Sequence, residues 1–196
     1  LISIGLTSKE EEYLKNNPII KVHNESNWPP YNYNINKNPK GFSIDYMNLL
    51  ASKVGVNIEY ISGFSWDEYI EKLKNNEIDV MLKTPLRNEI FNFTSSYTKS
   101  IDTVFTKKGS NLKKLKDFDG KTIAIIKGFY EEELLKKYYP NIKLISTNDT
   151  IESLKKVAFG EVDGAIDSFA VGSYYIQNNL ISNLKPAFEI EDERFN

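Results

Sequence analysis

The sequence contains no cysteine and only one histidine among its 196 residues. The absence of cysteine excludes disulfide bonds, thiolate metal sites and a cysteine nucleophile. The histidine, His23, lies in a predicted strand without a second metal-ligating side chain at a suitable spacing, so we expect it to be structural. No Ser-His-Asp arrangement can be recognised either. We therefore expect no metal, no cofactor and no catalytic residue.

The sequence also lacks a large charge excess and long apolar runs. Its 25 basic and 27 acidic residues are interspersed and give a net charge of −2, so no basic field exists that would hold a nucleic-acid backbone. No run approaches the roughly 20 apolar residues of a membrane-spanning helix. No secretion-signal pattern begins at Leu1, so we expect a mature or partial chain. A hydrophobic fraction of 40% is sufficient for one large domain or two small lobes.

A short phrase occurs twice, at 76–82 (NEIDVML) and at 160–166 (GEVDGAI), 84 residues apart. Each copy is apolar and follows an amphipathic helical pattern, which predicts a helix, a tight turn and a buried parallel strand. Loops that leave the carboxyl ends of parallel strands line the binding crevice of open α/β sheets. The residues after the two copies, Thr84–Arg87 and Asp167–Ser168, are therefore candidates for ligand contact.

The rest of the chain continues this alternation of helix and strand. Capping-box spacings at Thr7 with Glu10 and at Ser65 with Glu68 mark two helix starts. The order β-α-β-α-β occurs twice and is typical of parallel sheets with crossover helices. The patterns predict helices over 8–15, 42–53, 66–75, 130–138, 150–159 and 168–178, and strands over 19–23, 56–61, 76–82, 102–107, 121–127, 142–146 and 160–166.

Several motifs occur along nearly the whole chain in an order known from one family. They are WPPY at 28–31, GFSID at 41–45, TPLR at 84–87, LKDFDGK at 115–121, KG at 127–128 and GEVDGAID at 160–167. Together they resemble the type 3 solute-binding domains, the bilobed Venus flytrap modules of bacterial amino-acid uptake and extracytoplasmic sensing. The segments 6–14 and 134–141 are similar to members fused to membrane-bound sensor histidine kinases.

The resemblance implies an α/β, bilobed periplasmic-binding-protein-like (type II) fold, with two lobes of mostly parallel sheet flanked by helices and a central cleft. Family members complete lobe 1 after the return crossing, so we expect the C-terminal part of lobe 1 to be absent from this chain. The implied order is lobe 1 at 1–98 with a leading helix at 8–15, a crossing segment at 99–106, lobe 2 at 107–185 and the start of the return crossing at 186–196.

The candidate charged residues of the cleft each have two readings. Arg87 is either a bidentate fork for a ligand carboxylate or a solvated surface charge. Only residues 80–83 lie between Asp79 and the Thr-Pro-x-Arg motif at 84–87, which is fewer than is usual in the family. This shortened approach also allows Arg87 to be displaced from the cleft. Asp167 pairs either with a ligand ammonium or with the start of the helix near Ser168.

The remaining candidates are aromatic residues, an acid and a helix start. Trp28 and Tyr31 form either a stacking and cation–π wall or ordinary packing beside prolines. Gly128 opens a helix whose N–H groups either receive an anion or make a tight turn. The full expected set of ligand-binding residues is Glu25, Trp28, Tyr31, Thr84, Arg87, Gly128, Phe129, Asp167 and Ser168.

The resemblance implies an extracytoplasmic ligand-binding sensor domain that closes on an amino acid or small carboxylate and passes the closure to an attached signalling module. The expected partner is this small molecule and not nucleic acid, in a parent protein anchored to the membrane; a dimer formed through the signalling module stays open. One alternative is the stand-alone binding protein of an amino-acid ABC transporter. A third is an enzyme on the same fold, a prephenate-type dehydratase or part of a cell-wall lytic enzyme, for which Glu25 is the acid to consider.

Overall fold

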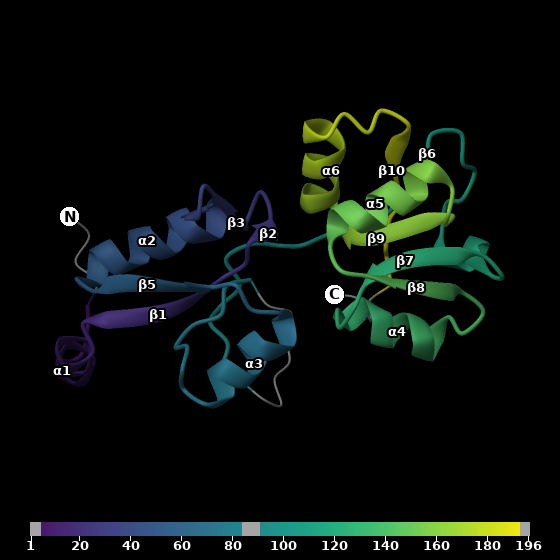
Figure 1. The fold of residues 1–196 in the computed structure, drawn as a ribbon. Coiled ribbons are helices and arrows are strands. Elements are labelled where there is room, and N and C mark those ends of the chain that lie inside the picture. The colour runs from purple at the N-terminus through teal and green to yellow at the C-terminus, as the bar shows by residue number, and fades with distance from the viewer. Residues whose placement is uncertain (1–4, 84–90, 193–196) are drawn as a thin grey trace. The chain divides into compact units, whose positions relative to one another are not determined.

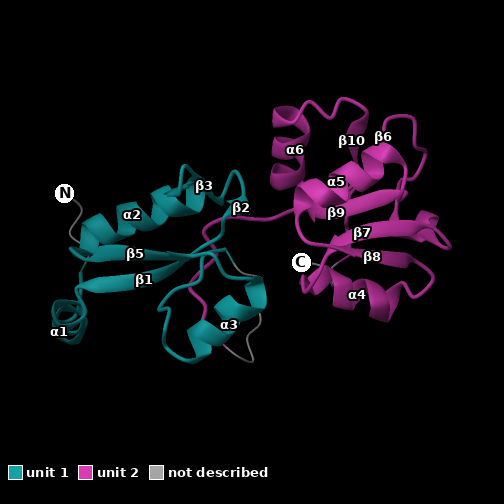
Figure 2. Ribbon diagram, in the orientation of Figure 1, with its two compact units in different colours: residues 1–84 teal, residues 85–196 magenta. Residues whose placement is uncertain are grey.

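The computed structural model describes residues 5–83 and 91–192. The chain divides into two compact parts, residues 1–84 and residues 85–196, which we call unit 1 and unit 2 (Figure 2). Both units combine helices with β-sheet, and each has buried apolar residues of its own (Figure 1).

Unit 1 is built on a pair of parallel strands, β1 and β5, which are aligned from Ile19 opposite Asn57 to Asn24 opposite Ser62. Figure 1 shows helices α2 and α3 on opposite sides of this pair. The described elements of unit 1 are α1 (Ser8–Asn16), β1 (Ile19–Asn24), β2 (Asn27–Trp28), β3 (Asn32–Ile35), β4 (Asn38–Lys40), α2 (Phe42–Val54), β5 (Asn57–Ser62) and α3 (Trp66–Lys74).

The helix boundaries of unit 1 follow the local signals in the sequence. Both predicted capping boxes form, at Thr7 with Glu10 before α1 and at Ser65 with Glu68 before α3. Helix α2 ends at Gly55, whose φ of 77° lies in the left-handed region that glycine adopts without a steric penalty. The two capping-box predictions are confirmed.

The first copy of the repeated phrase forms less strand than predicted. The segment 78–82 runs beside β1, but it makes one isolated parallel bridge, between Val22 and Val80. The Asp79 carboxylate accepts the Lys21 N–H at 2.8 Å, and the N–H groups of Asp79 and Val80 both point to the Lys21 carbonyl. The hydrogen bond from Lys21 to the Asp79 side chain replaces a backbone bond of the strand ladder. The prediction of a regular strand over 76–82 was therefore wrong.

The antiparallel ribbon β2-β3-β4 was not predicted. Strands β3 and β4 are joined through Asn36 and Lys37, whose φ angles of 51° and 65° are both positive, as a type I′ hairpin turn requires. Asn-Lys is a weaker hairpin signal than Asn-Gly, because only glycine adopts positive φ without cost. The ribbon therefore has little local signature in the sequence.

Unit 2 contains a five-stranded sheet with the strand order β10-β6-β9-β7-β8. Strand β7 is parallel to β8 and β9, whereas β6 is antiparallel to β9 and β10. The described elements of unit 2 are β6 (Asp102–Lys107), the 3-10 helix η1 (Leu115–Phe118), β7 (Thr122–Ile126), α4 (Tyr130–Tyr138), β8 (Lys143–Thr147), α5 (Thr150–Phe159), β9 (Gly164–Ser168), α6 (Phe169–Asn178) and β10 (Leu184–Glu189).

Alternate residues of the central strands of unit 2 point to opposite faces of its sheet. Ile123 and Ile125 of β7 pack in a cluster with Leu135 of α4, whereas Ala124 between them packs with Leu154 of α5. This alternation is the two-residue period of a strand, and it requires cover on both faces. Helix α4 covers one face, and α5 and α6 cover the other (Figure 1).

Gly172 brings α6 close to the sheet of unit 2. A Cβ atom at this position would lie 2.3 Å from the ring of Phe105, which is fully buried in β6. The Phe105 ring therefore fills the space that any larger residue of α6 would need. The six-residue strand β6, which the sequence reading places mostly in a crossing segment, thus belongs to the core of unit 2.

Candidate ligand-binding site

In unit 1, Glu25 follows the carboxyl end of β1, as predicted, and is held by His23. The His23 ring is buried, and its Nε2 atom lies 3.1 Å from Glu25 Oε2. Its other nitrogen, Nδ1, accepts the Leu82 N–H at 3.4 Å, so the ring proton lies on Nε2 and is donated to the carboxylate. His23 is structural, as expected, and it also orients a candidate ligand-binding acid.

The aromatic candidates of unit 1, Trp28 and Tyr31, lie together at the ribbon. Their ring centroids are 5.2 Å apart, and the ring planes are tilted by 36°. The ammonium of Lys83 lies 3.8 Å from the centre of the Tyr31 ring and 4.6 Å from that of Trp28. These distances are those of cation–π contacts. The sequence reading expected a surface for a ligand cation and did not include Lys83.

The loop that carries these aromatic rings is fixed by the start of α2. The N–H groups of Phe42 and Ser43 donate to the carbonyls of Pro30 and Tyr31 at 3.0 and 2.9 Å. Gly41 makes this approach feasible, since a Cβ atom there would lie 2.4 Å from the Tyr31 oxygen, and its φ is 115°. Two free N–H groups of the helix start are thereby satisfied by the loop.

Two of the predicted site residues, Thr84 and Arg87, lie outside the described residues. The described chain ends at Lys83 and resumes at residue 91. The prediction that Arg87 binds a ligand carboxylate therefore stays a prediction.

In unit 2, Asp167 and Ser168 are part of strand β9 and are both buried. The sequence reading put them in the loop after the strand, and this was wrong. The ladder with β6 extends β9, because Thr103 lies opposite Asp167 and Asp102 lies opposite Ser168. These two residues therefore form the last step of the strand, directly before α6 begins at Phe169.

The Asp167 carboxylate is anchored within unit 2. It accepts hydrogen bonds from the Thr150 hydroxyl at the start of α5 and from the Ser168 N–H, the latter at 2.6 Å. The sequence offered a second reading, in which Asp167 caps the following helix. In the structure the N-cap residue of α6 is Ser168, and Asp167 bonds to the N–H of this residue. The two bonds fix the carboxylate at the carboxyl end of β9.

A second buried acid, Asp102, lies at the same end of the β6-β9 ladder and was not predicted. Its carboxylate accepts a hydrogen bond from the Tyr130 hydroxyl at the start of α4. Burial, together with the charges of Glu131 and Asp102, raises the pKa of Tyr130 above its ordinary value, so this phenol stays protonated. The edge of unit 2 is thus acidic and rich in oxygen donors and acceptors.

Gly128 and Phe129 form the turn into α4, and their backbone is engaged within unit 2. Gly128 has a φ of 82°, and its N–H donates to Glu132 Oε2 at 3.1 Å. Glu132 also pairs with Lys136 at 2.6 Å. The Lys136 hydrogen bond and the Gly128 N–H lower the pKa of this carboxyl below its ordinary value. The anion expected at this helix start is therefore supplied by the chain itself.

The sequence model of the bacterial extracellular solute-binding proteins, family 3, matches residues 20–161 of the chain. The chain belongs to this family. Its membership confirms the predicted resemblance and locates the chain outside the cytoplasm. Within the described ranges, no helix of this family 3 domain is both long and apolar enough to cross a membrane.

Two relatives show where this family 3 domain stands among known proteins. The virulence sensor protein BvgS of Bordetella bronchiseptica is 23% identical over 94% of this chain, which spans 15% of the length of that protein. The arginine-binding extracellular protein ArtP of Bacillus subtilis is 27% identical over 79% of this chain and 62% of its own length.

The solved structures confirm the fold class. The crystal structure of a double mutant of the Bordetella pertussis BvgS VFT2 domain superposes with a TM-score of 0.84 at 22% identity, and the match covers 96% of this chain and 82% of that domain. The Venus flytrap fold is therefore shown. The sheet of unit 2 is a mixed one, since β6 runs antiparallel to the four other strands.

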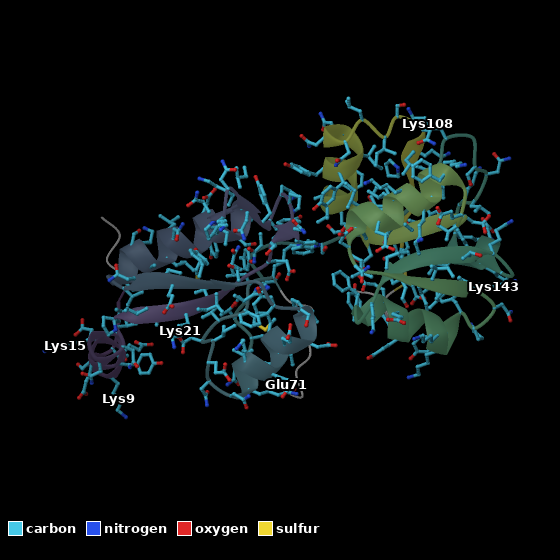
Figure 3. All side chains as sticks on the ribbon, viewed as in Figure 1. Lys9, Lys15, Lys21, Glu71, Lys108 and Lys143 are labelled. Carbon is cyan, nitrogen blue, oxygen red and sulfur yellow. The ribbon has the colours of Figure 1, made fainter. Side chains whose placement is uncertain are left out.

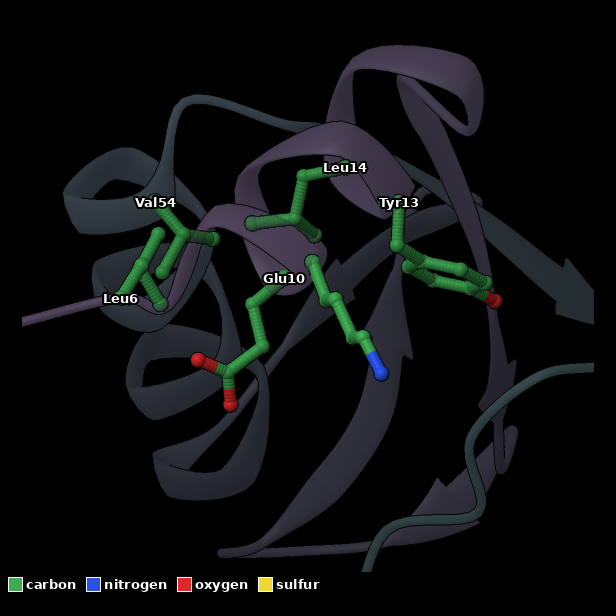
Figure 4. Close-up of a pocket in the computed structure, with 6 residues that line it drawn as sticks. Leu6, Glu10, Tyr13, Leu14 and Val54 are labelled. Carbon is green, nitrogen blue, oxygen red and sulfur yellow. The ribbon is translucent and has the colours of Figure 1, made fainter.

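Two surface hollows lie away from the carboxyl edges of the family 3 domain. One, of about 380 Å³, is lined by Leu6, Tyr13 and Leu14 around α1 and by Val54 at the end of α2 (Figure 4). The other, of about 530 Å³, lies between the start of β7 and the turn after β6 and is lined by polar residues such as Lys107 and Asp163. Neither contains a predicted ligand-binding residue.

Charged side chains are distributed around both units, as Lys21, Glu71, Lys108 and Lys143 illustrate (Figure 3). Within residues 5–83 and 91–192, no three His, Cys, Asp or Glu side chains gather closely enough to hold a metal ion.

Proposed function

We propose that this chain is the ligand-binding domain of an extracytoplasmic sensor. It binds a small polar solute, an amino acid or a small carboxylate, and transmits binding to an attached signalling module through the closure that its family resemblance implies. The observation that carries this proposal is the match to the sensor protein BvgS over 94% of the chain. The parent protein would be membrane-anchored.

The proposed contacts lie at the carboxyl ends of β1 and β9, where open α/β sheets bind their ligands. Unit 1 supplies Glu25, Trp28 and Tyr31, and unit 2 supplies Asp167 and Ser168. Anchored carboxylates of this kind suit a ligand ammonium, because an oriented charge costs little reorganisation on binding. Arg87 and Thr84 complete the proposed set, together with the turn at Gly128–Phe129, which would contact the ligand by its surface and not through a free N–H group.

A stand-alone transport receptor is the second candidate, and the similarity to ArtP favours it. The two candidates share every contact above and differ in what is attached to the chain. The full-length gene separates them, since a transmembrane segment followed by a kinase supports the sensor.

We further propose that the domain has no catalytic activity. The one histidine, His23, is buried and bonded to Glu25 and to the Leu82 N–H, and the buried acids Asp102 and Asp167 of unit 2 are bonded to hydroxyl groups. This arrangement is compatible with binding and offers no activated nucleophile beside a base.

A thermal-shift screen of the whole chain with amino acids and small carboxylates tests the function. A ligand that binds only the folded state raises the melting temperature. Asp167→Asn should then weaken the best ligand by about 2–5 kcal/mol, because an ion-pair partner is lost while the shape is kept. Asp119→Asn, on an exposed turn of the same unit, is the matched control and should bind normally. The absence of any stabilising ligand in the screen would contradict the proposal.

A further inference from the structure

The aromatic face of unit 1 is already covered by a cation of the chain. The Lys83 ammonium lies over both Trp28 and Tyr31, at 4.6 and 3.8 Å from the ring centres, and its Nζ atom is buried. The rings attract a cation through the negative potential of their faces, and this attraction increases when water is excluded. The Lys83 ammonium therefore forms part of the surface that Trp28 and Tyr31 present.

The backbone that presents Lys83 is fixed immediately before it. Leu82 is buried in the core of unit 1, and its N–H donates to His23 Nδ1. Lys83 itself adopts a φ of 47°, in the left-handed region that residues with side chains seldom occupy. Residues held in such seldom-occupied backbone regions cluster at ligand-binding and active sites.

The partner surface is equally well fixed. The loop from Trp28 to Tyr31 is held by the hydrogen bonds from Phe42 and Ser43 to its carbonyls. The indole Nε1–H of Trp28 is buried and has no acceptor among the described residues, so it can donate to an oxygen of a ligand.

We propose that Lys83 determines ligand specificity: its ammonium, held on the Trp28–Tyr31 face, excludes ligands with a cationic side chain and favours small acids with a net negative charge. This inference rests on the proposed function and specifies its ligand class. The chemical class is that of acidic amino acids and dicarboxylates, whose second carboxylate would meet an ammonium and an indole N–H.

Electrostatics decide between the two kinds of ligand. A second cation at the rings would have to displace Lys83 or lie beside it, and like charges repel strongly where water is excluded. Such repulsion against the wrong ligand is as effective for specificity as attraction to the right one. The relative ArtP is named for arginine, so this chain would differ from it in ligand charge.

Titration calorimetry of the whole chain with glutamate, glutamine and arginine tests the inference. Glutamate and glutamine have nearly the same shape and differ in charge, so their affinity ratio isolates the effect of the second carboxylate. We expect glutamate to bind at least about tenfold more tightly than glutamine, and arginine to show no binding at the same concentrations.

Three variants test whether the charge of Lys83 causes the preference for glutamate. Lys83→Met keeps the length of the side chain and removes the charge, so the glutamate preference should disappear and arginine affinity should increase. Lys83→Arg retains a cation and should retain the preference. Lys53→Met, in the exposed last turn of α2, changes the net charge equally and should have no effect. Tryptophan fluorescence should change in Lys83→Met and stay unchanged in Lys53→Met, because Lys83 covers the Trp28 indole and Lys53 lies on α2.

Wild-type arginine binding, or an equal glutamate-to-glutamine ratio in wild type and Lys83→Met, would overturn the assignment of Lys83 and leave the ligand-binding function standing. If none of the amino acids and carboxylates of the wider screen binds wild type or Lys83→Met, the proposed function is wrong and this inference falls with it.

Discussion

The two units differ most in what holds them together. Among the described residues, unit 2 buries two apolar clusters, one on each face of its sheet, which contain Phe118 and Phe105 respectively. The apolar cluster of unit 1 consists of Val22, Ile44 and Leu82, with partly buried neighbours around it. Apolar burial is the main favourable contribution to folding, so unit 2 has the larger reserve of stability.

Unit 1 compensates with buried polar contacts close to its candidate site. The Tyr69 hydroxyl donates to the Asn24 carbonyl at 2.8 Å, and the Asn24 amide donates to Asn32 Oδ1 at 2.7 Å. Tyr69 also packs edge-on against the His23 ring that orients Glu25. In unit 1 the residues that hold the fold are neighbours of those proposed to bind ligand, whereas unit 2 keeps a separate core beneath its acids.

The largest expected effect tests the core of unit 2. Phe105→Ala should destabilise the chain by about 3–5 kcal/mol, because it removes a fully buried ring and leaves a cavity beside Gly172. Chemical denaturation should be followed by circular dichroism, which reports both units, and by tryptophan fluorescence, which reports unit 1 because Trp28 and Trp66 both lie there. The circular dichroism midpoint should decrease more than the fluorescence midpoint. Equal shifts of the two midpoints would show that the two units unfold as one. The two units would then not differ in stability.

The next effect tests the loop that presents the aromatic rings. Gly41→Ala should cost about 3 kcal/mol, because its Cβ would overlap the Tyr31 carbonyl and its φ of 115° is unsuited to alanine. Here the fluorescence midpoint should decrease first, since Trp28 is on the displaced loop. Gly55→Ala is the matched control: its φ is also positive, but no atom lies within 4 Å of the added Cβ, so a smaller loss is expected. If Gly55→Ala loses as much stability as Gly41→Ala, the positive φ of the backbone, and not the contact with Tyr31, causes the loss.

A smaller effect tests the polar support of unit 1. Tyr69→Phe keeps the ring and removes the hydroxyl, which leaves the Asn24 carbonyl without this donor and should cost about 1–2 kcal/mol. Tyr60→Phe is the control, because the nearer partner of the Tyr60 hydroxyl is the exposed Asn48 side chain, which water can satisfy, and the other is the Ile44 carbonyl within helix α2. Ligand affinity in the thermal-shift assay should also decrease in Tyr69→Phe, since Tyr69 packs against His23. Unchanged affinity would separate the fold of unit 1 from its candidate site.

Local signals in the sequence predicted the helices and most strands because their causes are local. The capping boxes at Thr7 and Ser65 and the glycine stops at Gly55 and Gly160 depend on residues within a few positions. The ribbon and the end of β9 depend on partners elsewhere. Strand β9 extends through Ser168 only because β6 pairs with it from more than fifty residues earlier.

The candidate site shows the same division. Glu25, Trp28, Tyr31 and Asp167 could be named because strand ends and family motifs mark them. Lys83 and Asp102 could not, because their roles come from contacts with Trp28 and Tyr130 that are distant in sequence. The contact between His23 and Glu25 does have a signal in the sequence, because the two residues are two positions apart and residues with this spacing share one side of a strand.

The smallest effect concerns acid stability and the anion that unit 2 supplies to itself. The lowered pKa of Glu132 means that its charged form is favoured in the folded state, relative to an ordinary value of 4.5. Its contribution to the free energy of unfolding is therefore present above pH 4.5 and is lost as the pH falls through the lower folded-state pKa. Glu132→Gln should reduce stability at neutral pH by at most about 1 kcal/mol, since the Lys136 ammonium that pairs with it is largely exposed and screened by water. It should also flatten the decline of stability below pH 4.5, measured by denaturation at a series of pH values.

Glu133→Gln is the matched control, because this neighbour is exposed and makes the same change in net charge within the same helix. If both variants flatten the acid decline equally, the cause is the general charge at the start of α4 and not the hydrogen bond to Gly128. If only Glu132→Gln does so, the helix start of unit 2 is neutralised by the chain itself, and a ligand anion has no free helix terminus there. That result would sharpen the contrast with unit 1, where the Lys83 ammonium lies over the Tyr31 ring.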